Sequence, residues 1–301
     1  MGPTACGKTD LAIRLTQEIP ADIVSVDSAM IYRTMNIGTA KPSIAELMLA
    51  PHRLINLCDP AESYSAGQFC QDALREINHI HSNNHVPLLV GGTMLYFHNL
   101  LFGLADLPTA NVEIREQLMQ DAKKIGWLAM HARLEKIDPR AAQKIKPQDP
   151  QRIQRALEVF LITGKPISQL QQEYQQSVLH DYDVISIGLI PKDRQWLHNN
   201  ISNRFENMLQ QGLIDEVRAL HERPDMTADL PSMRIVGYRQ VWEYLDEKTD
   251  FETMKLKAIA ATRQLAKRQL TWLRSWKNLI VFDPREMNLV EKIKYIYQSR
   301  V

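Results

Sequence analysis

The chain has 301 residues, of which 45% are hydrophobic and 24% charged, and its formal net charge of +1 decides neither for nor against a nucleic-acid partner. Its three cysteines, Cys6, Cys58 and Cys70, form no C-x-x-C pair, which argues against a disulfide framework or a zinc knuckle and favours a reducing, cytoplasmic setting. No apolar run approaches the roughly 20 residues that a membrane span needs, and no signal-peptide pattern is present.

The sequence begins with a phosphate-binding pattern, G-x-x-x-x-G-K-[ST]. Its glycines would let successive N–H groups point at one anion, and the dipole of the following helix would add to the attraction. Lys8 would neutralise phosphate charge and the Thr9 hydroxyl would ligate Mg²⁺. The alternative is a plain glycine-bearing turn. We predict phosphate binding by Gly2, Pro3, Thr4, Ala5, Cys6, Gly7, Lys8 and Thr9.

Strands and helices alternate after this loop. A helix is predicted over Lys8–Ile19, a buried strand over Ala21–Val26, a helix over Gln68–His81 and a second strand over Val86–Val90. Strand, helix and strand at this spacing predict a parallel sheet with helices on its faces. His79, His81 and His85 lie near the end of the second helix without a carboxylate partner, so a metal site there is disfavoured.

The character of the sequence changes near Leu107, and no strand pattern returns before Tyr182. Predicted helices in this stretch cover Asn111–Gly126, Trp127–Lys136, Pro139–Ile145 and Pro150–Thr163, and Gln169–Gln176 is interpreted as a solvated helical face. A strand over Asp183–Ile190 precedes further helices at Arg194–Gln211, Leu213–Glu222, Val236–Leu245 and Phe251–Trp276. The predicted class is therefore α/β, with a P-loop NTPase-like parallel sheet core (1–106 and 183–301) and an inserted all-helical domain (107–182).

Asp27 ends the first strand and is the leading candidate for chemistry. ATP-using enzymes with this loop usually carry a second acidic residue at a strand end, but the strand Val86–Val90 leads into Gly91-Gly92-Thr93. Asp27 could be a magnesium ligand, a general base or only a helix cap. A small-molecule kinase, which would need the missing acid, and a nucleotide-binding regulatory protein with RNA affinity remain the alternative functions.

Basic residues gather in three places. The segment Arg263–Lys277 holds five basic residues and no acid, with Arg263, Lys267 and Arg274 on one helical face. The opposite face, with Leu265, Trp272 and Trp276, is predicted to be core. The basic face is either solvated surface or a track for a phosphate backbone. Smaller clusters occur at Gln151–Arg155 and Arg234–Arg239, where the arginines suit diphosphate or RNA or are simply solvated.

Together these stretches resemble the bacterial tRNA dimethylallyltransferases. The matching segments are GPTACGKT (Gly2–Thr9), SVDSAMIYRTMNIGTAKPS (Ser25–Ser43), HRLIN (His52–Asn56), LLVGGTMLYF (Leu88–Phe97), DPQRIQRALEVF (Asp149–Phe160), RIVGYRQ (Arg234–Gln240) and ATRQLAKRQLTWLR (Ala261–Arg274). They span nearly the whole chain, and DSAMIYRTMNIGTAKP is far more specific than the loop alone. The resemblance implies a P-loop-type core with a helical insertion, and transfer of a dimethylallyl group from dimethylallyl diphosphate to N6 of the adenosine just 3′ of certain tRNA anticodons.

The resemblance also implies roles for individual residues. Asp27 would be the general base, Thr93 would place the flipped adenine, and Lys8 and Thr9 with Mg²⁺ would stabilise the departing diphosphate. Arg239, with Arg234, would add a diphosphate or tRNA contact. The residues implied to contact the tRNA anticodon stem-loop are Asp27, Ser28, Ala29, Met30, Thr93, Arg115, Gln151, Arg152, Ile153, Gln154, Arg155, Arg234, Ile235, Val236, Gly237, Tyr238, Arg239, Lys267, Arg268, Gln269, Thr271, Trp272 and Arg274. A monomer without membrane association is expected.

One departure concerns the short strand that family members carry before the first glycine. Only Met1 precedes Gly2 here. A missing central strand would leave backbone groups unpaired, so we expect this chain to be less stable and less active than one extended upstream.

Overall fold

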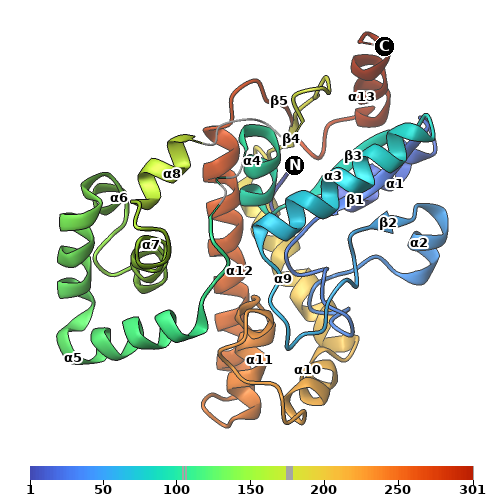
Figure 1. The fold of residues 1–301 in the computed structure, drawn as a ribbon. Helices are drawn as coiled ribbons and strands as arrows, with labels where there is room; N and C mark the ends of the chain where they lie inside the picture. The colour runs from blue at the N-terminus through green and yellow to red at the C-terminus, as the bar shows by residue number, and fades with distance from the viewer. Residues whose placement is uncertain (104, 106, 174–178, 301) are drawn as a thin grey trace. The chain divides into compact units, whose positions relative to one another are not determined.

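The computed structural model describes residues 1–103, 105, 107–173 and 179–300. It is a mixed α/β protein that divides into two compact units (Figure 1). The core unit comprises Met1–His98 and Asp181–Val301, and the helical unit comprises Asn99–His180. No helix among the described residues is long and apolar enough to cross a membrane. The last part of the predicted solvated face, residues 174–176, lies outside the described residues.

A three-stranded parallel sheet holds the first part of the core unit. Its order is β2-β1-β3, with β1 at Ala21–Val26, β2 at His52–Arg53 and β3 at Val86–Gly91. β1 has the predicted bounds and β3 runs one residue past them. Residues pair in order from Ala21 with Val86 to Val26 with Gly91, so the two strands end together. The two-residue strand β2 carries too short a pattern to be predicted.

Helices α1 (Lys8–Thr16) and α3 (Ala66–Ser82) both pack on β1 and β3. α1 stops three residues before the predicted end because the backbone turns ahead of Pro20. α3 begins earlier than predicted because Ser65 and Gln68 form a capping box that satisfies its first N–H groups. The sequence prediction missed α2 (Ile44–Leu49) and α4 (Met94–Phe102), and also α13 (Leu289–Gln298) near the end of the chain.

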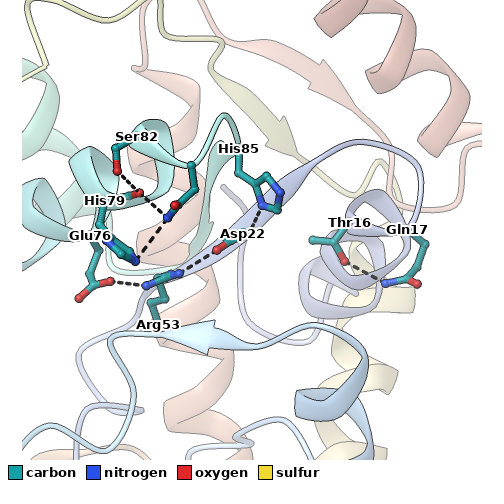
Figure 2. Close-up of polar contacts among 9 residues, drawn as sticks. Thr16, Gln17, Asp22, Arg53, Glu76, His79, Ser82 and His85 are labelled. Atoms are coloured by element: carbon teal, nitrogen blue, oxygen red, sulfur yellow. Dashed lines mark hydrogen bonds and ion pairs between the residues drawn. The ribbon is translucent and has the colours of Figure 1, made fainter.

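A cluster of charged residues lies at the end of this sheet where β1 and β3 begin (Figure 2). Arg53 donates to Asp22 at 2.9 Å and to Glu76 at 2.8 Å, and Nδ1 of His85 lies 2.6 Å from the second oxygen of Asp22. Burial alone would raise the pKa of Asp22, but the hydrogen bonds from His85 and Arg53 outweigh it and hold that pKa below its usual value. Arg53, Asp22, Glu76 and His85 thus form a network of ion pairs and hydrogen bonds.

A second sheet consists of β4 (Ile187–Leu189) and β5 (Ile280–Phe282), which pair in parallel. Only three of the eight residues predicted as a strand over Asp183–Ile190 are in β4, because β4 extends only as far as its partner β5 does. Met1 joins β4: its ammonium donates to the Ile187 carbonyl at 2.8 Å and its carbonyl accepts from Leu189 N–H at 2.8 Å. The predicted cost of the missing strand stays a prediction.

The remaining helices of the core unit surround its main apolar core. Their bounds are α9 (Arg194–Gln210), α10 (Leu213–His221), a 3₁₀ turn (Ser232–Arg234), α11 (Tyr238–Leu245), α12 (Phe251–Arg274) and α13 (Leu289–Gln298). The predicted start of α11 at Val236 was two residues early, because Gly237 adopts a positive φ and precedes the first helical turn. Buried side chains such as Phe205, Val217, Tyr238 and Met254 fill this core.

The helical unit has a core of its own, built from α5 (Val112–Ile137), α6 (Pro139–Lys144), α7 (Pro150–Thr163) and α8 (Ile167–Glu173). α5 is broken at Gly126, whose φ of 80° interrupts the helix where the sequence predicted a boundary. α7 has its predicted bounds, set by Asp149 and Pro150 at its start and Gly164 at its end. Within its described residues this unit contains no strand, as predicted.

Candidate active site

Two polar segments meet at the carboxyl edge of the first sheet. Because Val26 and Gly91 are paired, the residues that follow them, Asp27 on one strand and Thr93 on the other, emerge side by side. Thr93 Oγ1 accepts the Ser28 N–H at 3.0 Å, and Thr93 N–H donates to the Val26 carbonyl at 3.2 Å. The carboxyl edge of a parallel sheet is where α/β proteins bind ligands.

Asp27 is half-buried and takes part in a local turn. One of its carboxylate oxygens accepts the N–H of Ala29 at 2.8 Å. This is the cap-like role that the sequence left open, but a carboxylate has two oxygens and several acceptor positions, so capping does not use up its capacity. Asp27 can therefore anchor the turn and still accept a proton from a bound ligand.

The predicted phosphate loop, Gly2–Thr9, leads directly into α1. Gly7 has a φ of 84° and precedes the first turn of α1, so Lys8 and Thr9 begin the helix. Gly7 offers no side-chain hydrogen bond to cap this helix start, so its first N–H groups have no capping side chain. Lys8 Nζ donates to the loop's own Pro3 carbonyl at 2.6 Å. The loop is thus closed on itself by the cation that is predicted to meet a phosphate.

Two side-chain amides form hydrogen bonds with the backbone of this loop. Asn200 on α9 donates to the Ala5 carbonyl at 3.3 Å. Gln269 on α12 accepts the Thr4 N–H at 2.8 Å and donates to the Gly92 carbonyl at 2.8 Å. Gln269 is buried, so this bridge joins the loop to the turn that carries Thr93.

Arg204 is a residue of this site that the sequence prediction missed. It lies one helical turn after Asn200 on α9, and it is an electrostatic neighbour of both Asp27 and Cys6. Burial lowers its pKa, and the charges of Asp27 and Cys6 partly oppose that shift. An arginine remains protonated even so, and its charge acts electrostatically on Asp27 and on Cys6 of the loop. The sequence offered one indication of this burial: in the helical pattern, Arg204 lies at the margin of the apolar face formed by Leu197, Ile201 and Phe205.

The chain that follows Asp27 is held by Glu216 of α10. This carboxylate accepts the backbone N–H groups of Asn36, Ile37 and Gly38 at 2.7, 2.8 and 3.1 Å. The Tyr238 hydroxyl donates to the same side chain at 2.5 Å, and Tyr238 is fully buried. The motifs around Asp27 and around Tyr238 therefore support each other structurally.

Comparison with known proteins agrees with this geometry. The sequence model of the IPP transferase family matches residues 30–276. The chain belongs to the IPP transferase family. It is 54% identical over 293 residues to a tRNA dimethylallyltransferase of Coxiella burnetii, a match that covers 97% of each chain.

Solved IPP transferases have the same fold. The tRNA isopentenylpyrophosphate transferase of Bacillus halodurans is 36% identical with a TM-score of 0.70, covering 99% of this chain and 93% of its own. A counterpart from Staphylococcus epidermidis is 30% identical with a TM-score of 0.71, covering 100% and 98%. A eukaryotic dimethylallyltransferase, studied acting on tRNA, is 25% identical with a TM-score of 0.83, covering 99% of this chain and 78% of its own.

Helix α12 of this IPP transferase is oriented differently from the prediction. Trp272 was expected in the core but is 38% exposed, and its ring meets His98 edge-on at 5.7 Å. The residues that face inward are Ala266, Gln269 and Leu273. The prediction assigned the wrong face of α12 to the core, because it did not anticipate that a glutamine, Gln269, would be buried. Trp272 instead lies on the outer surface with the exposed residues Lys267, Arg268, Thr271 and Arg274.

The segment Arg234–Arg239 contributes mixed positions. Arg234 and Arg239 are exposed, and Arg239 donates to Glu243 one turn along α11 at 3.2 Å. Ile235 and Val236 are half-buried, whereas Gly237 and Tyr238 are buried. The structure therefore pairs Arg239 with a neighbouring carboxylate, and its predicted contact with diphosphate stays a prediction.

The predicted tRNA-contacting residues of the helical unit divide in the same way. Gln151 and Arg152 are exposed, while Ile153 is fully buried in the unit's core. Arg115 and Arg155 are paired with Glu158, which is itself fully buried: Arg115 donates at 2.9 and 3.2 Å and Arg155 at 2.7 Å. Gln154 donates to the Arg115 carbonyl at 3.0 Å. Polar or ionic partners within the unit thus hold Arg115, Arg152, Gln154 and Arg155, and Ile153 packs in its core.

Proposed function

We propose that the chain transfers a dimethylallyl group from dimethylallyl diphosphate to N6 of a tRNA adenosine beside the anticodon, releasing diphosphate. The observation that carries this proposal is the meeting of the phosphate loop, Asp27 and Thr93 around one sheet edge, with Gln269 linking the loop to the Thr93 turn. The names and the extent of the matching relatives support it. The core is proposed to be P-loop NTPase-like in form, with a prenyl diphosphate where related folds hold a nucleotide.

The phosphate loop would bind the diphosphate through the open N–H groups at the start of α1 and through Lys8, released from the Pro3 carbonyl. In the reaction the C1–O bond of the allyl group breaks and its electron pair leaves with the diphosphate. Preorganised cationic groups that neutralise this developing charge lower the barrier. Arg204 stands where it could add to this effect.

Magnesium is proposed to assist the same step. Mg²⁺ usually keeps several waters and takes few protein ligands beside substrate phosphates, so a hydroxyl at the start of α1 is a fitting donor and a protein cage is not required. Thr9 would supply that hydroxyl, and the bound ion would neutralise diphosphate charge.

Asp27 is proposed as the general base. N6 of the adenine forms the new bond to C1, and its proton passes to the carboxylate oxygen of Asp27 that is not bonded to Ala29. A stacked adenine could not reach this edge, so the base must leave the stack. Thr93, already bonded to Ser28 beside Asp27, is placed to contact the flipped base.

The test is a transfer assay with labelled dimethylallyl diphosphate, Mg²⁺ and unmodified tRNA, run beside an ATP-hydrolysis control. Label on tRNA with ATP intact is the expected result. Label absent from tRNA together with ATP turnover would overturn the proposal in favour of a kinase or ATPase.

A further inference from the structure

Gln269 belongs to a segment expected to touch tRNA, yet its side chain points the other way. It is 8% exposed, while its neighbours Lys267, Arg268 and Thr271 are exposed. Both of its polar atoms are used inside the protein, one by the Thr4 N–H and one by the Gly92 carbonyl. A side chain whose donor and acceptor are both bonded in the interior has little left to offer an RNA.

The two partners of Gln269 belong to opposite halves of the site. Thr4 lies in the loop proposed to hold the diphosphate. Gly92 lies immediately before Thr93, which is bonded to Ser28 next to Asp27. The amide therefore spans the group that would leave and the group that would accept the proton.

The approach at Gly92 is close enough to exclude a side chain. A Cβ at this position would lie 2.4 Å from Gln269 Nε2 and 3.3 Å from the Gly2 carbonyl oxygen. The Gln269 side chain thus fits between the backbone at Thr4 and the backbone at Gly92. It fixes the separation of these two segments through one hydrogen bond to each.

We infer that Gln269 is a positioning residue for the proposed transfer, which sets the distance between the diphosphate loop and the Asp27–Thr93 edge. This inference rests on the proposed function. Reactions that depend on orientation lose rate steeply when reacting groups are displaced by about 1 Å. Because α12 also carries the exposed basic residues, the same helix would connect an outer tRNA-facing surface with the inner spacing of the site.

The test compares Gln269→Met with Gln264→Ala. Methionine keeps the length and volume of the side chain but makes neither bond, and Gln264 is an exposed glutamine of the same helix that serves as the matched control. For Gln269→Met we expect kcat to fall and KM for dimethylallyl diphosphate to rise, lowering kcat/KM by roughly tenfold or more, as the loss of buried hydrogen bonds predicts. The dissociation constant for tRNA, measured without the prenyl donor, should stay within about twofold of wild type. The substitution removes no positive charge that could contact the phosphate backbone of the tRNA.

A direct readout separates this inference from the proposed function. Affinity for inorganic diphosphate, measured calorimetrically without tRNA, should weaken in Gln269→Met and not in Gln264→Ala. If wild type transfers no label while this difference persists, the proposed function fails and the role in the loop stands. If Gln269→Met does not fold, Gln269→Glu takes its place. Its carboxylate can accept from Thr4 but cannot donate to Gly92, and the same changes in KM and kcat are expected.

Two results would overturn the inference. Unchanged kcat, KM and diphosphate affinity in a folded Gln269→Met would show that the bridge sets nothing. Weakened tRNA binding with normal kinetic constants for the prenyl donor would make Gln269 an RNA contact.

Discussion

Asp27 has two oxygens with different surroundings, and this division suits it to a structural and a chemical part at once. One oxygen is fixed by Ala29 N–H, so the orientation of the carboxylate is set before any ligand arrives. Because both oxygens belong to one carboxylate, this hydrogen bond also fixes the position of the second oxygen. If Asp27 is the proposed base, a carboxylate held in this way would need no reorganisation when an adenine binds.

Replacing Asp27 by Ala should therefore abolish transfer far more than it weakens tRNA binding. We expect kcat to fall by two to four orders of magnitude, roughly the contribution of a positioned general base, with the tRNA dissociation constant nearly unchanged. Single-turnover transfer and filter binding measure the two quantities. Equal losses in both would instead identify Asp27 as a binding or folding residue.

Arg204 provides the second prediction at this scale. Replacing it by Gln removes a buried cation that interacts electrostatically with Asp27 and Cys6 while keeping a polar side chain. We expect a higher KM for dimethylallyl diphosphate and a kcat lower by roughly tenfold to a thousandfold, because the charge proposed to stabilise the leaving group is lost. Arg239→Gln, on an exposed side chain paired with Glu243, is the comparison. A larger effect at Arg239 than at Arg204 would restore the sequence-based assignment of the diphosphate contact.

Elements were predictable where the sequence carries explicit start and stop signals. α7 begins at Asp149-Pro150 and ends at Gly164, and its bounds match the prediction. β4 was predicted too long because a run of apolar residues does not reveal how far its partner extends, and β5 was missed because three residues carry no usable pattern.

The faces of α12 were less predictable than its bounds. The prediction placed the apolar residues inward and so rotated the helix to bury Trp272. The buried face includes Ala266 and Leu273 together with Gln269, whose two hydrogen bonds go to loops distant in the sequence. One sequence by itself does not indicate such partners. Arg204 escaped notice for the same reason, since its significance comes from Asp27 and Cys6, which lie far from it along the chain.

The outer surface of α12 leads to a third prediction. Lys267 and Arg274 are exposed, and the double substitution to Ala should weaken tRNA binding uniformly and make it less dependent on salt. The slope of log affinity against log salt concentration should fall by about 0.7 to 0.9 for each lost phosphate contact. Titrations between low and moderate salt give the slope, with Gln264→Ala as control. An unchanged slope would mean that this surface is merely solvated.

At the scale of the whole molecule, the chain contains two cores, each with an ionic group that acid would disrupt. Burial alone would raise the pKa of Glu158, but hydrogen bonds from Arg115, Arg155 and the Asn111 N–H hold it below its ordinary value of 4.5. The pKa of Asp22 in the core unit is likewise lowered below its ordinary value of 3.8. A carboxyl whose pKa is lower in the folded state stabilises the fold at pH values above the unfolded value, and loses that contribution as the pH falls through the folded value.

Stability should consequently be retained from neutral pH down to about pH 5 and decline below the ordinary carboxyl values. In Glu158→Gln we expect a lower melting temperature at pH 7, because the charge-assisted hydrogen bonds from Arg115, Arg155 and the Asn111 N–H are weakened, and a smaller further loss on acidification. Thermal unfolding followed at several pH values measures both. A variant with the same acid sensitivity as wild type would place the titrating groups elsewhere.

The Glu158 triad also constrains how this protein can change over evolutionary time. Losing either arginine reduces the neutralisation of a buried carboxylate, and losing the carboxylate leaves two arginines without their shared partner. Every single-step route away from the triad therefore passes through a less stable intermediate, whereas substitutions of the exposed residue Gln151 on α7 should cost little stability. Positions 115, 155 and 158 should be inherited as a block and be replaced, where they are replaced at all, together.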